Sequence, residues 1–181
     1  LNINNLLSER EYINASVINR NLGYWSEKLT VDKGSNDELS NNMAVLSNGT
    51  LIGITNNVSL TSSDVVLFSN SKFPMNISVK INTGDKEVYG ILNDYDGTYD
   101  VVGVVENIDI PVGSKVTTTG LGNIFPSGLF IGYVSNVETD NFDLSKVIKV
   151  IPGTSFDNIN YVTVVKKGKE WLLLLQFFRL F

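Results

Sequence analysis

The chain has 181 residues, of which 43% are hydrophobic and 10% aromatic, and it carries a formal net charge of −5. That composition supports a buried core, while the acidic balance argues against nucleic acid, whose phosphates need a clustered basic face. There is no cysteine and no histidine, which excludes disulfides and thiol nucleophiles and removes the usual general base and the commonest metal ligand.

The first fifteen residues predict a short amphipathic helix. Its candidate self-association residues lie at spacings of three and four, with one apolar residue beside them: Ile3, Leu6, Leu7, Arg10 and Ile13. Two interpretations stay open, the end of a coiled coil or a helix packed on the body, because about two heptads do not decide between them. No signal peptide is visible, and we expect a piece of a longer protein.

After residue 15 the pattern becomes that of strands. Residues 75–81 alternate apolar and polar side chains, which predicts one buried and one solvated face. Asn48 and Gly49 lie between two apolar runs and predict a type I′ hairpin, because that turn needs positive φ at both central residues. Further strands are expected near residues 15–18, 29–31, 64–68, 88–92, 101–105, 147–150 and 161–165.

About twelve short strands predict an all-β protein, and two small β-barrels suit this length better than one large barrel. We expect a first barrel over residues 16–74, completed by strand 161–165, and a second over residues 75–160. A boundary near Phe73-Pro74 and a core position for Trp25 follow from the same pattern. Residues 166–181 form an apolar tail too short to span a bilayer, and its role is not assigned.

Residues 117–132 form the most distinctive segment, predicted as a strand, a shaped loop and a second strand. Glycine tolerates positive φ and proline fixes φ, so this composition favours tight turns beside packed backbone. No side chain there titrates, which suits a structural or partner-binding loop better than catalysis. Its candidate residues are Gly120, Leu121, Gly122, Phe125, Pro126, Gly128, Ile131 and Gly132.

The same segment resembles the signature Thr-Ser-Gly-Leu-Gly-Gly-Ile-Phe-Pro-x-Gly-Ile/Leu-Pro-Ile-Gly of MreC, a bacterial cell-shape family. Thr119, Asn123 and Phe130 depart from that signature. Residues 29–35 resemble the family's Leu-Thr-Ile-Asp-Lys-Gly-Ser segment, and the ordered similarity runs from Ala15 to Val165.

The resemblance implies a membrane-anchored protein with a coiled coil and two extracytoplasmic β-barrels, arranged as in chymotrypsin-like proteases but without their activity. It implies a non-enzymatic scaffold of the cell-wall elongation machinery that needs no cofactor. The implied partners are a class B penicillin-binding transpeptidase, MreD, RodA and other MreC copies. We expect docking by β-augmentation or through the surface.

A hydrolase is the first alternative, and without histidine it would need a Ser–Lys or a carboxylate pair. Ser69-Asn70-Ser71-Lys72 matches the Ser-x-x-Lys pattern but lacks its companion motifs, so a polar turn explains it better.

Two further patterns bear on ligand binding. Asp94, Asp96 and Asp100 beside Gly97 suggest a calcium loop, but the EF-hand pattern fails and a hairpin turn is favoured. A wall-glycan binding module is the remaining alternative, and it would present aromatic side chains such as Tyr95 and Tyr99 in a row on one face.

Overall fold

The computed structural model describes residues 10–21, 28–70, 76–104, 108–122, 125–139 and 146–166. In these ranges the chain is all-β, as predicted, with 12 strands and one short 3₁₀ helix at Ser35–Asp37. The strands are β1 (Tyr12–Asn21), β2 (Lys28–Val31), β3 (Ala44–Ser47), β4 (Thr50–Asn56), β5 (Ser63–Leu67), β6 (Ile77–Asn82), β7 (Glu87–Tyr95), β8 (Tyr99–Val104), β9 (Lys115–Thr118), β10 (Phe130–Thr139), β11 (Lys146–Pro152) and β12 (Tyr161–Val165).

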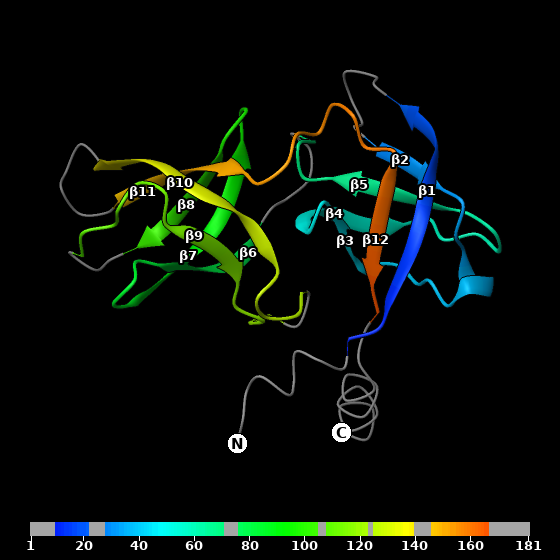
Figure 1. The fold of residues 1–181 in the computed structure, drawn as a ribbon, viewed down its shortest axis with the longest axis horizontal. Coiled ribbons are helices and arrows are strands. Elements are labelled where there is room, and N and C mark those ends of the chain that lie inside the picture. Colours follow the sequence, from blue (N-terminus) through cyan, green and yellow to red (C-terminus); the bar gives the residue numbers. More distant parts are fainter. Residues whose placement is uncertain are drawn as a thin grey trace.

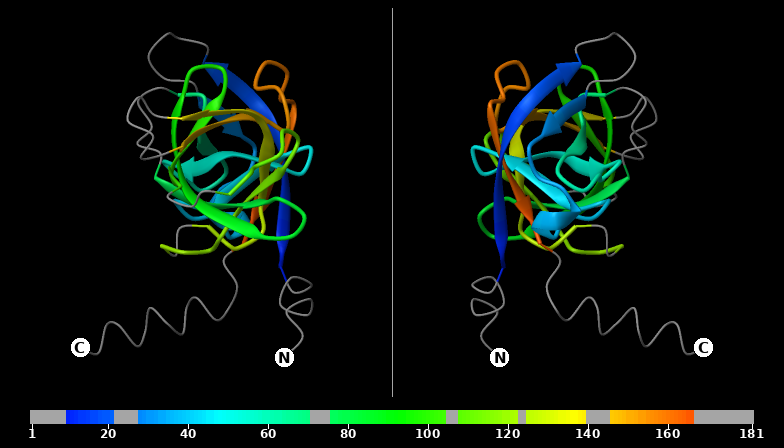
Figure 2. Two further views of the ribbon diagram at one scale, coloured as in Figure 1. Left: turned by 90° about the vertical axis from the view of Figure 1, so that its left-hand side faces the viewer. Right: turned by 90° about the vertical axis from the view of Figure 1, so that its right-hand side faces the viewer.

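Strands β6 to β11 form a closed six-stranded antiparallel barrel. Their pairing order is β11-β8-β7-β6-β9-β10, and β10 pairs back onto β11 to close the ring. Figure 1 shows this group on the left, and the left-hand view of Figure 2 looks into it. The alternation of buried and more exposed side chains suits a closed barrel. Strand β6 buries every second residue and so presents one continuous apolar face to the barrel interior.

The other six strands, β1 to β5 and β12, form what we call the N-terminal lobe. Strand β12 arrives from the far end of the chain and pairs with β1 and β3, while β5 pairs with β2 and β4. Each of these strands therefore has two neighbours, and the lobe occupies the right side of Figure 1.

The predicted hairpin at Asn48-Gly49 is confirmed. The two residues have φ of 49° and 76°, and Ser47 pairs with Thr50 directly across the turn. Positive φ at both positions is what a type I′ turn requires, and Asn and Gly are the residues that tolerate it at least cost.

The prediction of a helix up to residue 15 is wrong at its C-terminal end, because β1 begins at Tyr12. Ile13 lies in that strand opposite Val164, so pairing with β12 overrides the helical spacing read from the sequence. Ile3, Leu6 and Leu7 lie outside the described residues. So do Trp25, the Phe73-Pro74 boundary and residues 167–181.

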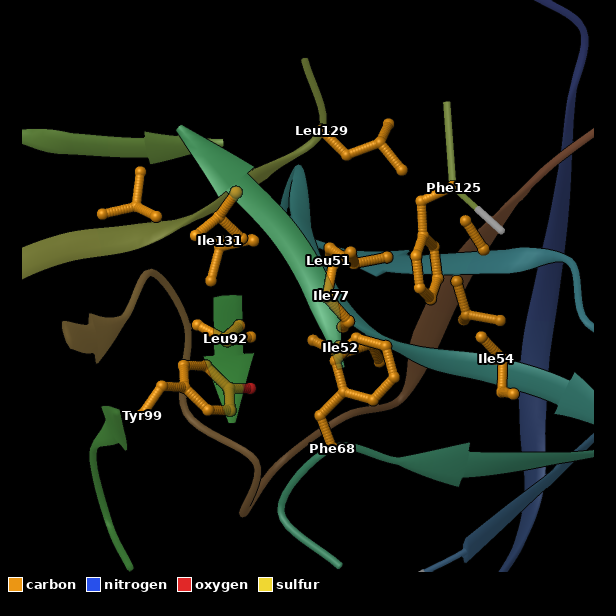
Figure 3. Close-up of a cluster of buried hydrophobic side chains, with 14 of the residues drawn as sticks. Leu51, Ile52, Ile54, Phe68, Ile77, Leu92, Tyr99, Phe125, Leu129 and Ile131 are labelled. Atoms are coloured by element: carbon orange, nitrogen blue, oxygen red, sulfur yellow. The ribbon is translucent and has the colours of Figure 1, made fainter. Parts of the chain in front are cut away.

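One hydrophobic cluster runs through the barrel and the N-terminal lobe. Figure 3 shows Phe68 of the lobe between Leu92 and Tyr99 of the barrel on one side and Phe125 on the other. The rings of Phe68 and Phe125 meet edge to face with centroids 5.8 Å apart. In the described part of the chain, no helix is long and apolar enough to cross a bilayer.

Candidate functional site

The shaped loop between β9 and β10 is held by one buried threonine. The Thr118 hydroxyl donates to the Pro126 carbonyl oxygen at 2.6 Å and accepts from the Leu129 N–H at 2.9 Å. Its backbone N–H donates to the Leu129 carbonyl oxygen, and its carbonyl oxygen accepts from the Gly128 N–H. Four hydrogen bonds on one fully buried residue make the loop a rigid part of the barrel.

The glycines of this segment meet two different requirements. Gly120, Gly122 and Gly128 have φ of 85°, 81° and 82°, so they occupy the left-handed region that the sequence predicted. Gly132 is needed for close approach instead, because a Cβ there would lie 2.0 Å from the Ile151 carbonyl oxygen on β11. The sequence alone did not distinguish these two roles.

Most apolar side chains of the loop are buried and face the core. Phe125 and Ile131 are 6% and 1% exposed, whereas Leu121 is 68% exposed. Of the predicted loop residues, Leu121 is therefore the apolar one available to a partner. Arg10, just before β1, donates to the Ser127 carbonyl oxygen at 2.5 Å and so ties the start of the described chain to this loop.

A different surface on the barrel gathers exposed apolar side chains. Tyr133 on β10 lies opposite Ile151 on β11, and their exposed fractions are 49% and 53%. The ring of Phe130 lies 5.0 Å from that of Tyr133, and the Lys115 ammonium stands 5.2 Å from the Phe130 ring. We call these four residues the β9–β11 patch.

Sequence reasoning missed the β9–β11 patch. The sequence carries no clear signal for it, because residues 130–139 do not alternate strictly between apolar and polar side chains and so do not mark Tyr133 as exposed. A second, smaller pair of exposed apolar residues lies on β7, where Tyr89 and Ile91 are 51% and 44% exposed. Exposed aromatic residues on rigid strands are typical of partner contacts.

Several charged side chains on the described surface form ion pairs. Burial raises the pKa of Asp64, but hydrogen bonds from Lys28, Asn57 and Thr30 outweigh it, and the pKa is lowered overall. Lys166 bridges Glu38 and Glu11, which raises the pKa of the lysine and joins the ends of β1 and β12. Such partly exposed pairs hold neighbouring strands in register.

The acidic pattern gains no metal-binding or catalytic geometry in the part of the chain that the structure describes. Asp96 accepts hydrogen bonds from Thr98, and Asp100 pairs with Lys149 at 2.7 Å. Among the described residues, no three metal-ligating side chains gather in one place. Lys72 of the Ser-x-x-Lys pattern lies outside the described residues, so that pattern is not tested.

One expectation about binding surfaces is wrong, and a second loses support. Tyr99 is fully buried, and burial raises the pKa of its hydroxyl, so Tyr95 and Tyr99 do not form an exposed row. β-Augmentation is also disfavoured, because every described strand already pairs with two neighbours and leaves no continuous free edge.

Comparisons with known proteins place this geometry in a family. A family model described as "Rod shape-determining protein MreC, barrel core" matches residues 17–166. The cell shape-determining protein MreC of Listeria monocytogenes is 35% identical over 173 residues, covering 94% of this chain and 58% of the relative. The MreC of Streptococcus pneumoniae is 33% identical, over 91% of this chain and 62% of the relative. The chain thus spans about three fifths of these relatives.

Solved structures of MreC proteins have the same fold as this chain. An MreC structure from Listeria monocytogenes superposes with a TM-score of 0.81 at 35% identity, over 87% of this chain and 76% of that one. The major periplasmic domain of the cell shape-determining filament MreC gives 0.77 at 31% identity, over 88% and 97%. A complex between PBP2 and MreC from Helicobacter pylori gives 0.63 at 20% identity, over 88% and 100%, and shows likeness of fold.

Proposed function

Because the chain belongs to the MreC family of rod shape-determining proteins, we propose that it is a non-enzymatic scaffold of the bacterial cell-wall elongation machinery. The family match over residues 17–166 is the observation that carries the proposal. It also accounts for the resemblance of the glycine-rich loop. Since the chain spans about three fifths of its relatives, the role of the whole protein is part of the proposal.

The described surface suits docking better than catalysis. Lysines on neighbouring strands pair with acids at Lys28–Asp64 and Lys149–Asp100, and two of the exposed apolar side chains, Tyr133 and Ile151, lie side by side in the β9–β11 patch. A hydrolase would need an activated nucleophile within hydrogen-bond reach of a base, and no pair in the described part of the chain favours that alternative.

The partner we propose is a class B penicillin-binding transpeptidase, contacted through the β9–β11 patch. The Helicobacter pylori MreC structure is described as a complex with PBP2, which supports this class of partner. Tyr133 projects from the middle of a closed barrel, so little conformational entropy is lost when it is buried. Tyrosines held in this way are frequent anchors of protein interfaces.

The wider setting is also part of the proposal. We place the chain on the extracytoplasmic face of the cell membrane, as the relative described as a periplasmic domain supports, with an anchor preceding residue 1. MreD, RodA and other MreC copies complete the proposed assembly. We interpret the N-terminal lobe as a second, chymotrypsin-like barrel formed by residues 16–74 with strand 161–165, beside a barrel within residues 75–160.

Isothermal titration calorimetry tests the docking. The chain is titrated with the extracytoplasmic domain of its host's elongation transpeptidase, and saturable binding is expected. Replacing Tyr133 and Ile151 by serine should weaken binding by at least about tenfold, since anchor truncation typically costs 2 kcal/mol or more. The matched control replaces Tyr89 and Ile91 by serine and should bind like wild type. Absence of wild-type binding, or equal losses in both variants, contradicts the assignment.

A further inference from the structure

A depression lies on the outer surface of the N-terminal lobe, over β12 and its two neighbouring strands. Its volume is about 510 Å³, within the roughly 300–1,000 Å³ range typical of small-molecule sites. Strand β12 forms the floor, β1 one wall, and the β3–β4 hairpin the other. The side chains that matter below are Asn14, Ser16, Leu46, Asn48, Tyr161 and Thr163.

The side chains that line this groove are uncharged, although the protein as a whole is acidic. None of the described residues that line it is charged; besides Ala15, Gly49 and Val162, they are two asparagines, one serine, one threonine, one leucine and one tyrosine. Tyr161 is 75% exposed, the highest value among the large apolar side chains that the structure describes as exposed. A tyrosine ring offers a flat apolar face with a polar edge, which matches the alternation of C–H faces and hydroxyls on a pyranose.

The two asparagines are already oriented by hydrogen bonds within the protein. The Asn14 carbonyl oxygen accepts from the Thr163 hydroxyl at 3.0 Å, and the Asn48 amide nitrogen donates to the Thr154 hydroxyl at 3.3 Å. Asn14 thus keeps its N–H donors for a ligand, while Asn48 keeps its carbonyl acceptor. One donor wall and one acceptor wall complement an acetamido group, which has one carbonyl oxygen and one N–H.

We propose that this groove binds a short glycan built of N-acetylated hexosamines. The sugar would stack on Tyr161, and its acetamido group would accept from Asn14 and donate to Asn48. The further claim that the natural ligand is the cell-wall polymer rests on the proposed extracytoplasmic location of the chain. The groove lies on the N-terminal lobe, whereas the β9–β11 patch lies on the barrel. The glycan proposal can therefore fail or hold independently of transpeptidase docking.

Two other ligand classes fit the groove less well. An extended peptide would gain affinity by pairing with a strand edge, but β12 is flanked on both sides by β1 and β3. An anionic ligand would need lysine or arginine, and the described lining has neither. The absence of charge also predicts binding that changes little with salt.

Nuclear magnetic resonance titration of the isotope-labelled chain tests the proposal. The probe is the tetramer of N-acetylglucosamine, and maltotetraose, which lacks acetamido groups, is the control sugar. We expect the side-chain amide signals of Asn14 and Asn48 to shift saturably with the tetramer and not with maltotetraose. The Tyr161→Ala variant should bind at least about tenfold more weakly, whereas Tyr89→Ala, which removes an exposed tyrosine on β7, should match wild type.

Three results would overturn the assignment. The first is no shift at millimolar tetramer; the second is equal binding of maltotetraose; the third is unchanged affinity in Tyr161→Ala. Because Tyr161 is on the surface, its variant is expected to stay folded, which an unchanged backbone spectrum verifies. An uncharged oligopeptide that binds where the tetramer does not would assign the groove to peptides instead.

Discussion

Replacing Phe125 by alanine tests whether the glycine-rich loop is a structural anchor. Its ring is 6% exposed and meets Phe68 of the N-terminal lobe edge to face, so truncation leaves a cavity where the loop and the lobe meet. Phe→Ala changes in cores cost about 3–5 kcal/mol. At about 2–4 °C per kcal/mol for a domain of this size, the melting temperature should fall by roughly 6–20 °C.

Differential scanning calorimetry measures this effect, with Leu121→Ala as the control in the same loop. Leu121 is 68% exposed, so its variant should change stability by no more than about 0.5 kcal/mol. A double-mutant cycle with Phe68→Ala should reveal about 0.5–1.5 kcal/mol of coupling between the rings. If Phe125→Ala is as stable as Leu121→Ala, the loop is not an anchor and the reasoning fails.

Three more changes probe the backbone and one ion pair. Gly132→Ala should destabilise strongly or prevent folding, because its Cβ would lie 2.0 Å from the Ile151 carbonyl oxygen, as urea unfolding would report. Gly49→Ala, at φ +76° in open space, should cost only about 1 kcal/mol in the same assay, and an equal cost for both would contradict the distinction. The pKa of Asp64 is lowered in the folded protein. Its ion pair therefore contributes to folding stability above the unfolded pKa of about 3.9, and this contribution is lost as the pH falls through the folded pKa. Asp64→Asn should therefore lose less stability than wild type between about pH 7 and pH 3, and equal acid sensitivity would refute that.

Local signals in the sequence predicted the strands well. Alternation located β6, and Asn48-Gly49 specified a turn whose φ values the structure reproduces. These features depend on neighbours within a few residues, so the sequence contains all that is needed to read them. The helix predicted to reach residue 15 failed because Ile13 pairs with Val164, a contact across almost the whole chain.

The candidate surfaces were harder to predict because burial depends on how distant strands pack. Phe125 was predicted as part of a structural or partner-binding loop, and only the packing of the N-terminal lobe against it shows that its ring is buried. Tyr133 and Ile151 looked like ordinary strand residues until the β10–β11 pairing placed them side by side on the outside. The groove beside Tyr161 likewise exists only because β12 returns between β1 and β3.

Hydrogen exchange of the chain, free and in complex with the transpeptidase's extracytoplasmic domain, tests the scaffold account most directly. Amides in β9, β10 and β11 around the β9–β11 patch should gain protection, while those around Tyr89 on β7 should not change. Protection confined to the N-terminal lobe, or none at saturating partner, would contradict docking through this patch.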